Sequence, residues 1–181
     1  MKVELVHRKL RKCLYIYLGA TEERGVGIFA AKAFKAGEIV LADEDGDYYD
    51  HVVSYTELLR LGCGLDRTIQ VGPDAFKLPT GSLDDFTNHS CDPNTGVRLT
   101  ERGTVVVALR DIGAHEELTY DYSTYLNNPY ERMVCRCGAP NCRGVIGSFA
   151  TLPAELRERY IGLGVVGDFV RQPPACTEAA D

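Results

Sequence analysis

Residues 85–94 read Asp85-Phe86-Thr87-Asn88-His89-Ser90-Cys91-Asp92-Pro93-Asn94. Small polar side chains gathered around a proline form ordinary Asx-type turns in many proteins. This stretch also presents, within four residues, the amide of Asn88, the imidazole of His89 and the thiol of Cys91. A neighbouring histidine and cysteine do not by themselves make a cysteine protease, because the context that such a nucleophile requires is missing. The stretch decides the fold only together with the motifs on either side of it.

The strongest of these motifs lies downstream, where three cysteines fall within eight residues as Cys135-x-Cys137-x4-Cys142. Thiolates brought together by the bends at Gly138 and Pro140 can converge on a tetrahedral zinc ion. The chain has seven cysteines, and an odd number with local clustering is a poor disulfide framework. Three reduced thiols that are neighbours by chance are the alternative. A structural zinc ion needs a fourth ligand, which the adjacent sequence does not provide.

Two weaker motifs complete the set. Upstream, the glycines of Arg24-Gly25-Val26-Gly27 allow a backbone to approach a ligand and to expose N–H groups to an anion. An ordinary turn explains them equally well, and no third glycine follows at the spacing of a dinucleotide-binding loop. Residues 117–122, Glu-Leu-Thr-Tyr-Asp-Tyr, are either a strand end whose aromatic rings fill the core or a pair of phenols around one narrow site.

The rest of the chain predicts a mostly β, β-rich α+β domain. Its 181 residues are 45% hydrophobic, which suits one globular domain with an appended segment. Strands are expected at 12–18, 39–41, 94–99, 104–109 and 118–120, with a hairpin turn at 100–103. Helices are expected at 55–61 and at 154–160, the second ended by Gly162 and Gly164. We expect residues 62–82 to be irregular and the last residues to be frayed.

Charge and hydropathy narrow the class of partner. The net charge of −6 argues against a free-standing nucleic-acid binder, which is usually basic. An acidic surface suits a basic partner, although it also simply aids solubility. No apolar run approaches the length of a membrane span, and Met1–Leu5 lack the apolar core of a signal peptide. We therefore expect a soluble intracellular protein, without membrane or direct nucleic-acid partners, in either the cytoplasm or the nucleus.

Taken in order, the four motifs resemble those of the SET-domain protein-lysine methyltransferases that carry a post-SET zinc segment. The resemblance covers about residues 12–147. It implies a set of small β-sheets whose C-terminal part threads under a loop as a pseudoknot, which is uncommon among folds. It also implies an organisation into an N-terminal flank (1–11), a SET domain (12–125, with a variable insert at about 43–81), a post-SET zinc segment (131–147) and a C-terminal helix and tail (148–181). Residues 1–11 contain no cysteine, so a cysteine-rich pre-SET module is not expected.

The resemblance assigns roles to residues at matching positions. It supplies the fourth zinc ligand, so that a structural Zn²⁺ is expected on Cys91, Cys135, Cys137 and Cys142. It assigns binding of S-adenosylmethionine to Gly25, Val26, Gly27, Phe86, Asn88 and His89. Asp85 departs from the pattern, because many members carry a basic residue there.

The resemblance also implies the reaction. Tyr122 matches the principal catalytic tyrosine, whose hydroxyl aligns the methyl sulfonium with the incoming amine. Tyr120 occupies a position where the family alternates between Phe and Tyr, and a Tyr there implies mono- or di-methylation. The expected activity is methyl transfer to the ε-amine of a lysine in a histone or another protein. The amine must first lose a proton, because the reference pKa of lysine is about 10.4.

One alternative from another class stays open. The chain would then be a non-catalytic, zinc-stabilised module that binds a basic peptide. Such a module needs neither Tyr122 nor the Asn88-His89 pair. The acidic run from Asp43 to Asp50 could attract a basic peptide in either case, or form a solvated loop.

Overall fold

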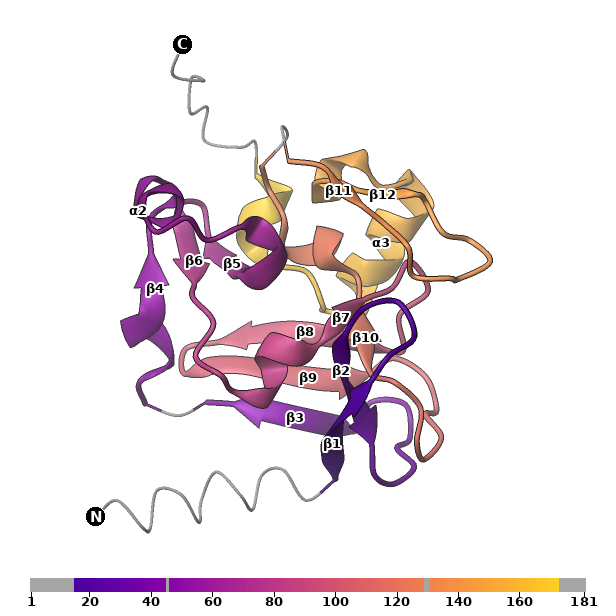
Figure 1. Cartoon of the computed structure of the whole chain (residues 1–181). Helices are drawn as coiled ribbons and strands as arrows, with labels where there is room; N and C mark the ends of the chain where they lie inside the picture. The colour runs from indigo at the N-terminus through magenta and orange to yellow at the C-terminus, as the bar shows by residue number, and fades with distance from the viewer. Residues whose placement is uncertain (1–14, 45, 129–130, 173–181) are drawn as a thin grey trace, which may run out of the picture.

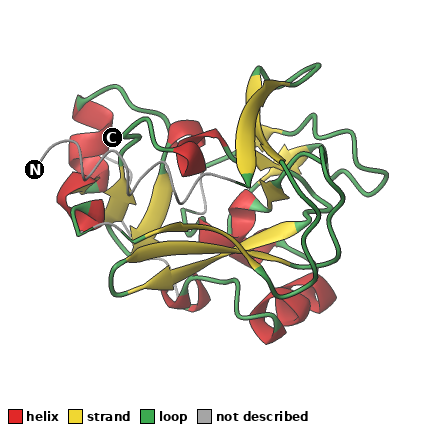
Figure 2. Cartoon of the chain, turned by 90° about the horizontal axis from the view of Figure 1, so that it is seen from below, coloured by secondary structure: helices red, strands yellow, loops and turns green. Residues whose placement is uncertain are grey.

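The computed structural model describes residues 15–44, 46–128 and 131–172. Short strands and single helical turns dominate it (Figures 1 and 2). The strands are β1 (Ile16–Ala20), β2 (Val26–Ala30), β3 (Ile39–Asp43), β4 (Val52–Val53), β5 (Ile69–Gly72), β6 (Ala75–Lys77), β7 (Asn88–His89), β8 (Thr95–Thr100), β9 (Gly103–Ala108), β10 (Thr119–Tyr120), β11 (Met133–Val134) and β12 (Val145–Ile146). The α-helices are α2 (Tyr55–Arg60) and α3 (Ala154–Gly162). The 3₁₀ turns are η1 (Tyr48–His51), η2 (Leu65–Arg67), η3 (Leu83–Phe86), η4 (Tyr122–Tyr125), η5 (Phe149–Thr151) and η6 (Asp168–Arg171).

Among the described residues the strands form five small sheets. Two have three strands, in the orders β3-β9-β8 and β4-β6-β5. The other three are the pairs β1-β2, β10-β7 and β11-β12. The β10-β7 pair is parallel, whereas the other pairings are antiparallel. The mostly β fold expected from the sequence is therefore confirmed; the pseudoknot threading stays a prediction.

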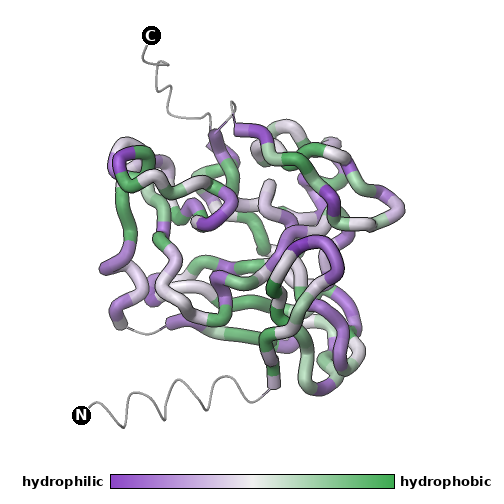
Figure 3. The backbone as a smooth tube through the Cα atoms, in the orientation of Figure 1, coloured by the Kyte–Doolittle hydropathy of each residue, from purple (hydrophilic) through white to green (hydrophobic). Residues whose placement is uncertain are grey.

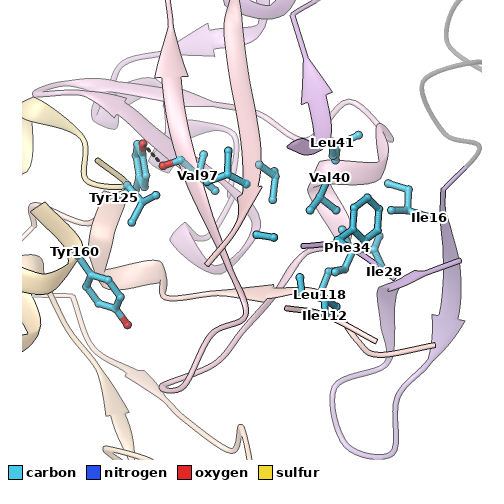
Figure 4. Close-up of a cluster of buried hydrophobic side chains, with 14 of the residues drawn as sticks. Ile16, Ile28, Phe34, Val40, Leu41, Val97, Ile112, Leu118, Tyr125 and Tyr160 are labelled. Atoms are coloured by element: carbon cyan, nitrogen blue, oxygen red, sulfur yellow. Dashed lines mark hydrogen bonds between the residues drawn. The ribbon is translucent and has the colours of Figure 1, made fainter. Parts of the chain in front are cut away.

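The β8-β9 hairpin carries the centre of the core. In β9 the consecutive residues Val106, Val107 and Ala108 all lie in the buried cluster and Val105 packs against it, so both faces of this strand are covered. Hydrophobic positions gather along β3, β8 and β9, while the outer loops are mostly polar (Figure 3). At one end of the cluster the hydroxyl of Tyr125 donates a hydrogen bond to the carbonyl of Val97 at 2.9 Å, which fixes η4 to β8 (Figure 4).

The hairpin turn depends on one glycine. Gly103 has a φ of +150°, and a Cβ built there would lie 1.9 Å from the carbonyl oxygen of Asp43. We expect Gly103→Ala to lower the free energy of unfolding by about 3 kcal/mol, because a backbone strand would have to move. Denaturant unfolding measures this change. Gly46→Ala is the control, since a Cβ there meets nothing within 4 Å; equal stability of the two variants would contradict the prediction.

Most expected elements are present. Strands lie at 39–43, 95–100, 103–108 and 119–120, and helices at 55–60 and 154–162. The first strand begins at Ile16, after a turn at Tyr15. Residues 12–14 of the expected strand lie outside the described residues, as do the expected N-terminal flank and the tail from 173 onward. Within the described residues, no helix is long and apolar enough to cross a lipid bilayer.

The prediction that residues 62–82 are irregular is wrong. Strands β5 and β6 pair there around the turn at residues 72–75. The pattern was hidden because buried polar side chains occupy both strands. Gln70, buried in β5, donates a hydrogen bond to the Gly72 carbonyl at 2.9 Å and accepts one from the Asn127 N–H at 2.9 Å. Lys77 ends β6 and is 2% exposed.

Candidate active site and metal centre

The parallel β7-β10 pair brings two of the sequence motifs together. Asn88 is paired with Thr119, and His89 with Tyr120. Asn94, 2% exposed, locks the arrangement with its side-chain amide. The amide donates to the Glu117 carbonyl at 2.7 Å and accepts from the Thr119 N–H at 2.9 Å. The buried amide of Asn94 therefore serves as a backbone clamp, a role that its place at the end of a turn did not reveal.

The first motif joins the same network through Arg24. Its guanidinium donates to the His89 carbonyl at 2.9 Å and pairs with Glu117 at 2.5 Å. The Asn88 amide donates to the other Glu117 oxygen at 2.9 Å and to the Val26 carbonyl at 3.2 Å. Arg24 and Glu117 belong to the first and third motifs. Their residue types alone did not predict that they form an ion pair, because 93 residues separate them in the sequence.

The glycine motif is only partly a turn. Gly25 has a φ of +74°, and a Cβ built there would meet nothing within 4 Å. Val26 and Gly27 already belong to β2. At Gly27 a Cβ would lie 2.7 Å from Glu117 and 2.8 Å from Asn88. Gly27 is therefore required by the packing of its neighbours, whereas Gly25 leaves open space beside its backbone, as a bound ligand needs.

Phe86 lies in η3 and packs, partly buried, against the main hydrophobic core. The structure thus gives this ring a packing role, and its contact with a cofactor stays a prediction.

The two tyrosines of the third motif lie against each other. The ring centroids of Tyr120 and Tyr122 are 4.9 Å apart. The Tyr122 hydroxyl donates a hydrogen bond to the Thr87 carbonyl at 2.9 Å. Burial raises the pKa of Tyr122 to about 12 and raises the pKa of Tyr120 well above its ordinary value. Both phenols are therefore neutral near pH 7 and cannot act as general bases there.

A small pocket with a volume of about 50 Å³, open to solvent, adjoins these rings. It is lined by both tyrosines and by residues of η2, η3, β6, β8 and β9. The side-chain hydroxyls of Thr68 and Thr87 face no hydrogen-bond partner, although both oxygens are buried. Buried hydroxyls without a partner are costly. The pocket is also lined by charged residues of η2, η3 and β6, which suits a polar ligand.

The four cysteines predicted to bind zinc lie together. The Cys91 and Cys135 sulfur atoms are 3.7 Å apart, and those of Cys135 and Cys142 are 3.6 Å apart. The Cys137 sulfur accepts a hydrogen bond from the Cys91 N–H at 3.4 Å. Zn–S bonds of about 2.3 Å in a tetrahedron place the sulfur atoms about 3.8 Å apart. The donor set and its spacing therefore fit a structural zinc ion.

Electrostatics at the cluster distinguish its members. Burial raises the pKa of Cys91 and Cys135. At Cys137 burial acts in the same direction, but it is outweighed by hydrogen bonds, first from the backbone N–H groups of Cys91 and Ala139, and the pKa is lowered to about 7. A bound Zn²⁺ favours the thiolate of each ligand.

His89 could replace Cys142 as the fourth zinc ligand, because its ring nitrogen lies within 4.8 Å of the sulfur atoms of Cys91, Cys135 and Cys137. Burial lowers the pKa of His89 to about 4, so the ring is neutral. Its Nδ1 accepts the Tyr122 N–H at 3.2 Å, which assigns the proton to Nε2, 3.3 Å from the Cys91 sulfur. A protonated nitrogen offers no lone pair to a metal. The geometry favours His89 as a hydrogen-bond donor to the Cys91 thiolate.

The segment that carries the cysteines is also tied to the tyrosine motif. Arg143 donates to the Asp121 carboxylate at 2.8 Å, and the Tyr160 hydroxyl of α3 donates to the other oxygen at 3.2 Å. Asp121 is 1% exposed. Tyr122 itself packs against the cysteine cluster. The metal centre and the pocket thus share one wall.

The fold and the site define a small β-rich domain in which paired phenols lie beside a polar pocket and a cluster of cysteines packs behind them. The protein belongs to the SET domain family, whose model matches residues 25–123, more than half of the chain. The cysteine-rich segment lies beyond that match.

Relatives and solved structures agree with this assignment. The chain is 35% identical over 176 residues to histone-lysine N-methyltransferase NSD3 of Mus musculus, which covers 89% of this chain and 10% of that protein. The methyltransferase domain of human SETMAR has a TM-score of 0.57 at 25% identity, covering 74% of this chain and 58% of that one. Arabidopsis thaliana SUVH6 in complex with SAM shares the fold, with a TM-score of 0.55 at 20% identity over 72% of this chain and 33% of that one. The chain spans between 2% and 13% of the length of the curated relatives that it matches.

Proposed function

We propose that this protein transfers a methyl group from S-adenosylmethionine to the ε-amine of a protein lysine, in a histone or another basic protein. The observation that carries the proposal is the pair of neutral, half-buried phenols of Tyr120 and Tyr122, which line one polar pocket. Membership of the SET domain family and the names of its relatives support the same reaction.

The chain's own residues divide the work. S-adenosylmethionine, when bound, supplies a methyl group made electrophilic by its sulfonium. The backbone from Gly25 to Gly27, together with Phe86, Asn88 and His89, holds it, and the open space beside Gly25 fits such a ligand. The pocket would hold the lysine side chain beside the two tyrosines, so that positioning dominates the rate.

The tyrosines orient the amine and do not take its proton. Their raised pKa values keep them protonated, so the lysine ammonium loses its proton to water before attack. Burial of the ammonium beside a sulfonium favours this loss. A structural zinc ion on Cys91, Cys135, Cys137 and Cys142 holds the post-SET segment against the wall that carries Tyr122.

The experiment is incubation of the full chain, supplied with zinc, with methyl-labelled S-adenosylmethionine and core histones or a cell extract. We expect ε-N-methyllysine in a discrete protein, identified by mass spectrometry. The alternative class, a peptide-binding module, predicts retention of basic peptides without any label. Absence of S-adenosylmethionine binding would refute the proposal that the protein is a methyltransferase.

Gly27 offers a test of the cofactor site. Gly27→Ala must displace the Asn88–Glu117 contact, and we expect it to weaken S-adenosylmethionine binding about tenfold, the loss of roughly one hydrogen bond. Calorimetric titration measures the affinity. Gly113→Ala is the control, because a Cβ there approaches no atom closer than 3.9 Å. An unchanged affinity in Gly27→Ala would remove this network from the cofactor site.

We further propose mono- or di-methylation, because the Tyr120 hydroxyl occupies room at the pocket wall that further methyl groups would need. Tyr120→Phe is expected to raise the number of methyl groups added per lysine, measured by mass spectrometry of a peptide substrate. A product distribution identical to that of the wild type would contradict it.

A further inference from the structure

Lys77 is a buried charge to which the proposed mechanism gives no role. It lies at the end of β6, is 2% exposed and lines the pocket beside the two tyrosines. Lysine is rarely buried unless its ammonium is paired. Here the ammonium nitrogen lies 3.3 Å from Asp85, 3.4 Å from Asp84 and 3.9 Å from Asp43. The ring of Tyr48 also lies below it, 5.0 Å from the nitrogen.

The carboxylates of this group, the Lys77 cluster, are themselves held in place. One Asp85 oxygen accepts hydrogen bonds from the backbone N–H groups of Thr80 and Gly81, at 2.7 Å each. Asp84 accepts a short hydrogen bond from the Ser82 hydroxyl. The three carboxylates are 12–18% exposed. One ammonium against three carboxylates gives the cluster a formal charge of about −2 that is poorly screened, and Lys77, Asp84 and Asp85 carry it to the pocket wall.

The remaining charged groups of the pocket contribute less. Asp66 and Arg67 of η2 lie 4.0 Å apart as an opposite-charge pair, with side chains 63% and 76% exposed, so water screens both. Tyr120 and Tyr122, from β10 and η4, are neutral. Tyr48 of η1 is neutral as well, because burial raises its pKa. The Lys77 cluster therefore dominates the field that these groups exert on a ligand in the pocket.

We infer, on the basis of the function proposed above, that the Lys77 cluster sets the protonation of the substrate amine in the pocket. The carboxylates attract the incoming lysine as an ammonium. The Lys77 charge opposes a second cation and favours release of the proton to water, which leaves the lone pair on the substrate nitrogen. Removal of the Lys77 charge should thus raise the pKa of the bound amine, and removal of a carboxylate charge should lower it.

The test is the pH dependence of kcat, which reports groups in the enzyme–substrate complex. Lys77→Met should raise the pKa of the bound amine, so the rising limb of the profile moves to higher pH by about half a unit or more. Asp84→Asn should move the limb to lower pH by a similar amount. Lys35→Met is the control, because Lys35 lies in an exposed pair with Asp111 and its loss changes the net charge equally; its profile should match the wild type.

The outcomes separate this inference from the proposed function. An inactive wild type would refute the function. An active wild type whose variants lose rate without a shift, or shift in the same direction, would reduce the cluster to a structural support and overturn the inference. If Lys77→Met does not fold, Asp84→Asn decides alone, since an unmoved or alkaline-shifted limb contradicts the proposal. Lys77→Arg, which keeps the charge, should restore the wild-type profile.

Discussion

Tyr122→Phe is expected to lower the rate of methyl transfer by a factor of about 10²–10³, the usual cost of removing one preorganised hydrogen-bonding group at a reacting centre. The substitution removes only the hydroxyl that donates to the Thr87 carbonyl at 2.9 Å. The ring, with its packing against Tyr120 and the cysteine cluster, stays in place. The loss should therefore appear in kcat, while cofactor affinity changes little and the free energy of unfolding falls by no more than about 1 kcal/mol.

Tyr125→Phe is the matched control for this experiment. Tyr125 is a more deeply buried tyrosine, and its hydroxyl likewise donates to a backbone carbonyl at 2.9 Å, here that of Val97. Its loss should cost about 1 kcal/mol of stability and little activity. Label incorporation measured for both variants at the same temperature distinguishes the two roles. Equal activity of Tyr122→Phe and Tyr125→Phe would exclude Tyr122 from the reaction.

The sequence could predict the chemistry-bearing segments because each motif combines residue types that serve one task. Three closely spaced cysteines predict a thiolate site, and the structure brings Cys135 and Cys142 within 3.6 Å. The fourth sulfur comes from Cys91, 44 residues away from Cys135. No local rule contains that distance, so its place depended on the resemblance to a family.

Long-range pairing limited the prediction elsewhere. The Arg24–Glu117 pair and the Asn94 clamp bind segments that are far apart in the chain. Their partners become neighbours only through the parallel β7-β10 pair, a sheet of two residues on each strand, too short to show a periodic pattern. The strands within residues 62–82 were missed for a related reason. Gln70 and Lys77 place polar side chains at buried positions, so these strands lack the alternating hydrophobic pattern by which a strand is predicted.

Cys135→Ser is expected to abolish stoichiometric zinc binding and to lower the melting temperature. Cys135 lies between Cys91 and Cys142 in the cluster, so its loss removes a central ligand. The energy of a structural zinc ion is folding energy for the segment that it holds. Here that segment carries the β11-β12 hairpin and packs on Tyr122. Activity should fall with the metal and return when zinc is restored to chelated wild-type protein, but not to the variant.

Cys63→Ser is the control, since Cys63 is a free thiol outside the cluster. Metal content by mass spectrometry and thermal unfolding give the two readings. Two further variants decide the fourth ligand. Because the proton lies on His89 Nε2, Cys142→Ser should lose zinc, whereas His89→Gln should retain it with an affinity lowered about tenfold to a hundredfold, as for a lost hydrogen bond to a metal ligand. Retention of zinc by Cys142→Ser with its loss from His89→Gln would exchange the two roles, because only one of these groups can complete the tetrahedron.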